Sequence, residues 1–85
     1  MTLRELTEAW YESRLVSGVD TEGRQYAGMP LVLEMRRGAV GVILQTFSEA
    51  TPVGRRSLSF RLVPTSRFDK GRQEFAVDLE PMPCN

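Results

Sequence analysis

The chain contains no histidine and only one cysteine, Cys84, among its 85 residues. Histidine is the commonest general base and a frequent metal ligand, so its absence removes the simplest catalytic and metal-binding arrangements. A single cysteine excludes an intramolecular disulfide and gives no sign of an oxidising compartment. Its position beside Pro83, close to the end of the sequence, does not suit an activated nucleophile.

Other signals are missing as well. No apolar run approaches the ~18–20 residues that a membrane-spanning helix needs. Residues 1–10, MTLRELTEAW, mix charged and apolar side chains and lack the apolar core of a signal peptide. Phosphate-binding loops and serine-nucleophile motifs are absent. We therefore expect a cytoplasmic, non-enzymatic protein with no cofactor, no metal site and no membrane segment.

The length and the charge balance bound the function further. Residues 1–85 suffice for one domain with one modest core. Eleven basic and eleven acidic side chains give zero net charge, which disfavours binding of nucleic acid or membranes by bulk charge alone. The charges are uneven, because residues 35–72 carry eight basic and two acidic side chains.

The first predicted element is a helix over residues 1–14. Thr2 is a good N-cap, and Glu5 three residues later completes a capping box. Three apolar residues recur at helical spacing and predict a stripe that faces the core: Leu3, Leu6 and Trp10.

The longest apolar stretch, residues 29–47, is split in the middle by Arg36, Arg37 and Gly38. Two strand-like halves around a short basic break predict a β-hairpin. The second half, residues 39–47, is apolar on both faces, which is typical of a strand covered on both sides. We therefore expect a central strand with the core on one face and the helix on the other.

Alternating patterns and turn residues predict the remaining strands. Residues 15–19 form a short strand, residues 20–23 a turn, and residues 24–36 one long kinked strand. Residues 57–63 alternate until Pro64 ends them, residues 65–72 form a loop, and residues 73–80 alternate again. Sequential strands with short connections pair as an antiparallel meander. The predicted fold is α+β: an N-terminal helix (1–14) packed on a curled five-stranded sheet (15–80), as a half-barrel or small barrel, followed by a tail (81–85).

The hairpin PLVLEMRRGAVGVILQTFSE resembles the first two strands of Sm-type barrels, which also place a helix before five strands. The chain departs from them in its extra turn, Asp20–Gly23, and in lacking the asparagine-bearing end of their first motif. The resemblance implies a small barrel, and no functional residue is carried across.

The meander predicts where the cations gather. Connections two apart in a meander lie at the same end of the sheet, so the turn at residues 36–38 and the loop at residues 65–72 should meet. This predicts a cationic pole of five residues, Arg36, Arg37, Arg67, Lys70 and Arg72. Arg55 and Arg56 should lie at the opposite end, and Phe68 is a candidate stacking side chain. The simpler interpretation is that these are solvated turns whose charge is partly neutralised by Asp69 and the acidic last strand.

Two functional hypotheses follow. The first is a small intracellular module that binds another protein, as accessory subunits, antitoxins and phage inhibitors do. Its exposed strand edges could serve strand addition or a homodimer. The second is a nucleic-acid-binding small barrel that uses the cationic pole to contact phosphates.

Overall fold

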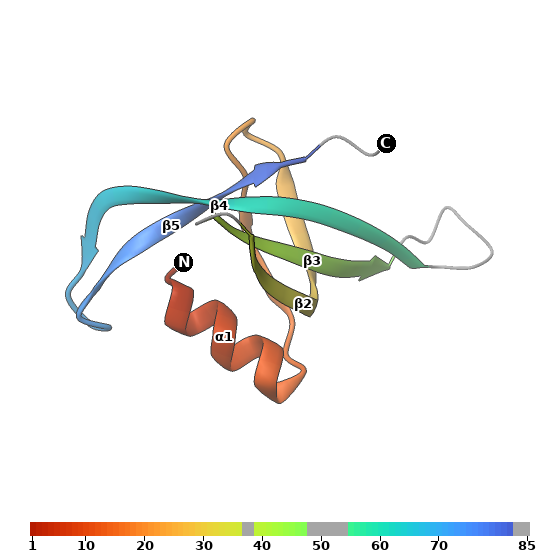
Figure 1. Cartoon of the computed structure of the whole chain (residues 1–85), viewed down its shortest axis with the longest axis horizontal. Coiled ribbons are helices and arrows are strands. Elements are labelled where there is room, and N and C mark those ends of the chain that lie inside the picture. Colours follow the sequence, from red (N-terminus) through yellow and green to blue (C-terminus); the bar gives the residue numbers. More distant parts are fainter. Residues whose placement is uncertain (37–38, 48–54, 83–85) are drawn as a thin grey trace.

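The computed structural model describes residues 1–36, 39–47 and 55–82, and of these it leaves the side chains of residues 36, 46, 47, 55 and 56 undescribed. One helix precedes five strands (Figure 1): α1 Leu3–Glu12, β1 Val16–Val19, β2 Gln25–Arg36, β3 Ala39–Phe47, β4 Arg55–Asp69 and β5 Glu74–Pro81. The described residues include no helix with the length and apolarity that a bilayer crossing requires.

The strands form one antiparallel sheet in the order β1-β2-β3-β4-β5, which confirms the predicted meander. The sheet curls into a nearly closed barrel whose open seam lies between β1 and β5. Among the described residues, the Thr21 amide, just after β1, bridges this seam by donating to the Leu79 carbonyl at 3.0 Å. The N-terminal residue Met1 also lies against β5, where its carbonyl accepts a hydrogen bond from the Val77 amide at 2.7 Å.

The helix begins as the sequence predicts, but it presents a different face to the core. Thr2 is the N-cap, and its hydroxyl accepts a hydrogen bond from the Glu5 amide at 3.1 Å. Leu6 and Ala9 are buried, whereas Leu3 and Trp10 are each 41% exposed. The prediction that Leu3 and Trp10 are core residues is therefore wrong. The small side chain of Ala9 lets the helix approach the sheet on one flank of Leu6, which leaves the other flank at the surface.

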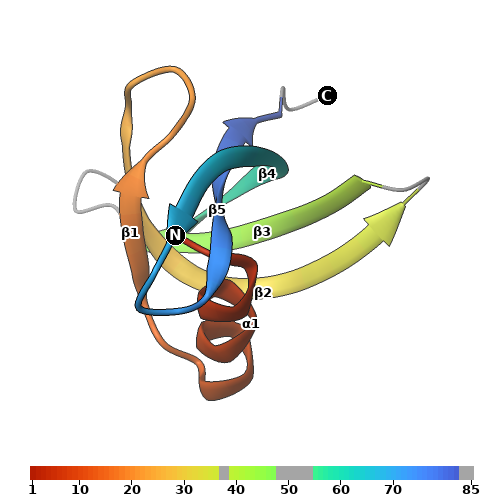
Figure 2. The same ribbon diagram turned by 90° about the vertical axis from the view of Figure 1, so that its left-hand side faces the viewer.

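The helix lies below the curled sheet in the views of Figures 1 and 2, and it packs mainly against β2. Leu6 belongs to the same buried cluster as Val42 and Leu44 of β3. The other buried members come from β2, β4 and β5: Tyr26, Phe60, Leu62 and Leu79. The expectation that core and helix cover opposite faces of β3 is thus wrong, because both lie on its concave face.

β2 is the long kinked strand that the sequence predicts. Its turn from β1 closes with a hydrogen bond from the Gly23 amide to the Asp20 carbonyl at 3.1 Å, and Gly23 has a φ of 81° that glycine tolerates best. Further along, the register with β3 shifts between Pro30 and Val32. Leu31 is the extra residue of this bulge. The bulge bends β2 and changes the direction in which its side chains point.

β4 does not end at Pro64, as the sequence suggested, but continues to Asp69. The Leu79 carbonyl points to Thr21 and therefore away from β4, so the cross-strand pair Leu62–Leu79 is a non-hydrogen-bonded pair. Such pairs recur at every second position of an antiparallel ladder, so the pair Pro64–Val77 is non-hydrogen-bonded as well. The amide that proline lacks would point toward the β3 side, where the pairing of β4 with β3 stops at Arg61. Proline therefore removes no ladder hydrogen bond here.

Gly18 and Tyr26 are cross-strand partners on β1 and β2. The Tyr26 ring lies over Gly18 so closely that a Cβ added there would sit 2.6 Å from its hydroxyl oxygen and 3.0 Å from Cζ. Tyr26 is only 7% exposed and packs against Phe60 with ring centroids 5.7 Å apart. An aromatic side chain covering an edge-strand glycine fixes the register of the two strands.

We expect Gly18→Ala to lower the free energy of unfolding by about 1–3 kcal/mol, as overpacking does. In a Tyr26→Phe background the cost should fall, because the hydroxyl oxygen, the nearest atom, is gone. Urea denaturation of the four chains of this double-mutant cycle measures the coupling.

Gly41→Ala is the matched control, because its Cβ would meet the Phe60 carbonyl oxygen at 3.6 Å and the Glu34 carbonyl oxygen at 4.0 Å, both ordinary contacts. Equal costs of Gly18→Ala with and without the tyrosine hydroxyl would contradict the proposed crowding.

Candidate functional site

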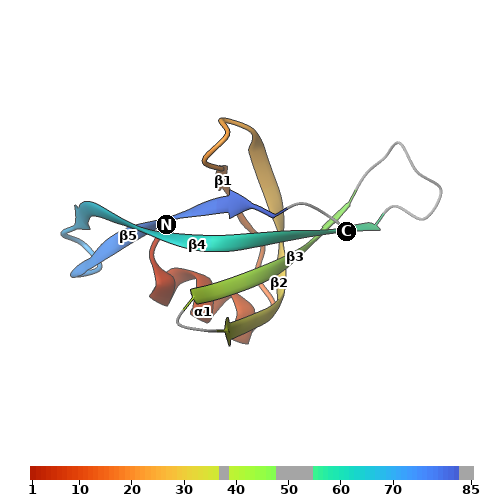
Figure 3. The same cartoon turned by 45° about the horizontal axis from the view of Figure 1, so that its top comes forward.

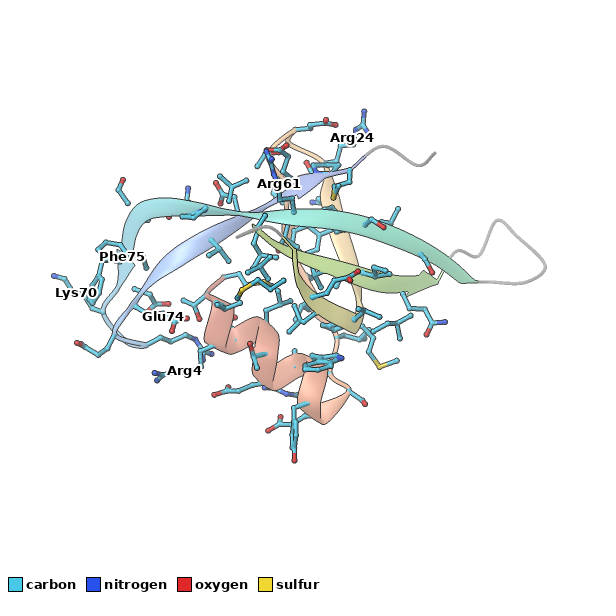
Figure 4. The ribbon with its side chains drawn as sticks, in the orientation of Figure 1. Arg4, Arg24, Arg61, Lys70, Glu74 and Phe75 are labelled. Atoms are coloured by element: carbon cyan, nitrogen blue, oxygen red, sulfur yellow. The ribbon has the colours of Figure 1, made fainter. Side chains whose placement is uncertain are left out.

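The structure describes three members of the predicted cationic pole completely, namely Arg67, Lys70 and Arg72. Arg37 and the side chains of Arg36, Arg55 and Arg56 lie outside the described residues, so their binding role stays a prediction. The β4–β5 turn carries Lys70 at its tip (Figure 4).

Both described arginines of the pole already contact carboxylates. Arg67 pairs with Asp78 across β4 and β5. Arg72 reaches back to the helix, with its Nε 3.0 Å from the Glu5 carboxylate and its Nη1 4.0 Å from Glu8. These contacts agree with the simpler interpretation of the loop, in which neighbouring acids neutralise part of the positive charge.

The described end of the β2–β3 hairpin lies apart from the β4–β5 turn. In Figure 2 the two point in different directions, and in Figure 3 the β4–β5 hairpin extends well beyond the ends of β2 and β3. β4 pairs with β3 only as far as Arg61 and then continues to Asp69 with β5 alone. At about 3.3 Å per residue this extension carries the β4–β5 turn well past the described start of β3.

Phe68, the predicted stacking side chain, pairs instead with Phe75 across the hairpin. Their ring centroids are 5.1 Å apart and the rings meet edge to face. Phe68 is 47% exposed and Phe75 57% exposed, so this pair lies beyond the core at the end of the hairpin. The pair stabilises the hairpin end locally and keeps Phe68 engaged with a neighbour.

Glu74 ties the hairpin to the start of the helix, and Figure 4 shows it and Arg4 side by side. Its Oε1 accepts a hydrogen bond from the Arg4 amide at 2.8 Å, and its Oε2 lies 3.8 Å from the Arg4 Nε. A carboxylate at a helix N-terminus satisfies a free amide and faces the positive end of the helix dipole. The hydrogen bond from the Arg4 amide, followed by one with the Thr2 side chain, lowers the pKa of Glu74.

Exposed apolar side chains gather elsewhere, along one side of the helix and the neighbouring β2–β3 hairpin. We call this surface the apolar rim. Leu3, Trp10 and Leu31 are each 41% exposed and Met35 is 75% exposed. The rim consists of these four exposed residues and the half-buried Val40, which also packs against the core: Leu3, Trp10, Leu31, Met35 and Val40.

Trp10 connects the helix to β2 within this rim. Its indole Nε1 donates a hydrogen bond to the Leu31 carbonyl at 3.0 Å. That carbonyl belongs to the bulge residue of β2, which has no partner on β3. The indole is thus held in one orientation while two fifths of the residue remain open to solvent.

A groove of about 380 Å³ continues the rim between the helix and β4. Leu3 and Val40 lie on both the rim and the groove wall, and Met35 is the cross-strand partner of Val40. The remaining lining residues are mostly apolar: Ala39, Arg61, Leu62, Val63, Pro64 and Val77. The groove exists because β3 begins at Ala39 while β4 extends beyond it.

The sequence pattern does not indicate that the rim residues are exposed together on one surface. Helical spacing places Leu3 and Trp10 on the apolar stripe and cannot tell the centre of the stripe from its edge. Met35 beside two arginines was the one visible sign, since methionine and arginine are enriched in interfaces. Within the described part of the chain, no three acidic or cysteine side chains gather closely enough to hold a metal ion.

Comparison of the chain with protein families, with curated proteins and with solved structures finds no match. The resemblance of the hairpin to Sm-type barrels gains no support from these comparisons.

The carboxylate of Glu74 makes stability depend on pH. Its pKa is lower in the folded chain than its ordinary value of 4.5, so the folded state binds fewer protons than the unfolded state. Its contribution should be complete above about pH 4.5 and should disappear as the pH falls through the lower folded-state value. Glu74→Gln should flatten the decline of unfolding free energy over this range, as urea titrations at successive pH values would show.

Glu22→Gln controls for the loss of one negative charge, since Glu22 lies on the β1–β2 turn and its Oε2 is 3.6 Å from Arg24. Identical pH profiles for Glu74→Gln and the unaltered chain would refute the role given to Glu74.

Proposed function

We propose that this chain is a small, non-enzymatic intracellular binding module, of the accessory, antitoxin or phage-inhibitor type, that contacts another protein through the apolar rim. The observation that carries the proposal is Trp10, a large aromatic side chain held by a hydrogen bond and yet 41% exposed. Tryptophan is among the residues that contribute most to binding energy at protein interfaces.

The neighbours of Trp10 support the same conclusion. Single exposed apolar residues are ordinary on protein surfaces, whereas contiguous ones mark contact sites. Here Trp10 bonds to Leu31, while Leu3 and Val40 border one groove and Met35 pairs with Val40. A partner covering the rim would remove apolar surface from water without having to order a mobile indole first.

Nucleic-acid binding through the cationic pole has less support. Arg67 and Arg72 would have to leave the carboxylates of Asp78 and Glu5 before they could bind phosphate. We therefore favour a protein partner.

Met35→Glu should abolish recognition of such a partner, or weaken it at least about tenfold, because it places a charge in a desolvated contact. Met35 is 75% exposed, so the substitution should leave folding intact. Affinity capture followed by identification and titration of the captured protein measures the loss. Trp10 is the only tryptophan, and its emission should shift to shorter wavelength as the partner covers it.

Tyr11→Glu is the matched control, because Tyr11 is 86% exposed on the same helix and is not part of the rim. The proposal fails if Met35→Glu and Tyr11→Glu bind the captured protein equally, or if no protein is captured specifically.

A further inference from the structure

β1 presents a free strand edge to the seam. The Asp20 amide donates to the Arg24 carbonyl at 2.9 Å, which makes this pair a hydrogen-bonded one. Hydrogen-bonded pairs alternate along an antiparallel ladder, so Gly18 bonds Tyr26 while Ser17 and Val19 point their amides and carbonyls away from β2. No described residue pairs with the backbone of Ser17 or Val19 on that side.

The seam is already bridged on either side of this edge. Residues Met1 and Thr2 lie antiparallel to Ala76 and Val77 of β5, as a short added strand would. At the turn, Thr21 bonds to β5 through its amide. Between these contacts a cavity of about 510 Å³ remains, bordered by β1 on one side and by Arg67 and Asp78 on the other.

The chemistry of this cavity suits a positively charged donor. The Tyr26 hydroxyl donates to the Met1 sulfur at 3.9 Å, and its oxygen accepts no hydrogen bond from a described residue. Burial raises the pKa of the Tyr26 phenol, and the carboxylates of Glu5, Asp78 and Asp20 raise it further.

Of the three carboxylates near the Tyr26 hydroxyl, Asp20 is the one that can still pair with a cation. Arg72 pairs with Glu5, and Arg67 pairs with Asp78. The Asp20 Oδ1 accepts the amides of Glu22 and Arg24 in the turn, but Asp20 forms no ion pair with a described residue.

We propose that the seam binds an extended peptide segment of a partner protein, which pairs as an added strand with Ser17 and Val19 and places a lysine or arginine beside Asp20 and Tyr26. Strand addition of this kind takes its affinity from the main chain and its selectivity from alternate side chains. A second copy of the chain fits less well, because pairing of two β1 edges would bring two Asp20 carboxylates toward each other. This surface is separate from the apolar rim.

The probe is a fluorescein-labelled peptide of alternating threonine and lysine, titrated with the whole protein and followed by anisotropy. Two N-methylated isomers of the same peptide carry methyl groups on alternate sets of amides. Only one set faces β1 in an added strand, so one isomer should bind at least about tenfold more weakly while the other keeps its affinity. A peptide in which glutamate replaces lysine should bind at least about tenfold more weakly as well.

Two protein variants complete the test. Ser17→Pro removes an amide that faces only the seam, so it should weaken binding of the lysine peptide about tenfold without lowering the melting temperature. Asp20→Asn keeps an oxygen acceptor for the turn and should weaken binding about three- to tenfold by removing the charge.

Equal binding of the two methylated isomers would overturn strand addition even if Ser17→Pro does not fold, because that comparison uses the unaltered protein. Equal binding of the glutamate peptide, or no binding of the lysine peptide, would overturn the proposed partner. A dimer in sedimentation equilibrium that Ser17→Pro dissociates would assign the edge to a second copy instead.

Discussion

Burial of Leu6 inside the curl of the sheet is the contact on which the rest of the structure depends. Leu6 is fully buried and meets side chains from four of the five strands in one cluster. A chain of 85 residues cannot build a second core of this kind. The sheet therefore curls around this single core, to which the helix contributes Leu6 and the strands contribute the other buried side chains. The same arrangement leaves one flank of the helix, with Leu3 and Trp10, at the surface.

Curling five strands around one core brings the first and last strands near each other without pairing them. β1 has only four residues, and a short edge strand limits unwanted pairing with other chains. Tyr26 lying over Gly18 holds this strand against β2, while Met1 and Thr21 bridge to β5. The seam is therefore a defined part of the fold. Both β1 and β5 are held in a fixed register, and β1 keeps free backbone amides and carbonyls along the seam.

Alternation and turn chemistry predict the helix, the five strands and the Asp20–Gly23 turn, because these features depend on neighbouring residues alone. They do not predict which face of β3, a strand that is apolar on both faces, the helix covers. Nor do they predict how far β4 extends beyond its pairing with β3. Pro64 shows the limit, since whether proline ends a strand depends on which way its missing amide would point. Trp10 shows the same limit for the site. The sequence places it on the apolar stripe, but its exposure depends on how closely Ala9 lets the helix approach the sheet.

The arginines illustrate how a charge pattern can serve the fold. Arg61 pairs with Glu80 at 2.8 Å, while Arg67 pairs with Asp78 and Arg72 with Glu5. Exposed pairs of this kind contribute about 0–1 kcal/mol each, so they do not hold the protein together. The first two join β4 to β5, whereas the Arg72–Glu5 pair joins the β4–β5 hairpin to the helix, whose start also meets Glu74 through the Arg4 amide. Because these arginines are already paired with carboxylates, both proposed contact surfaces rely on other groups: apolar side chains at the rim, and backbone pairing together with the Asp20 carboxylate at the seam.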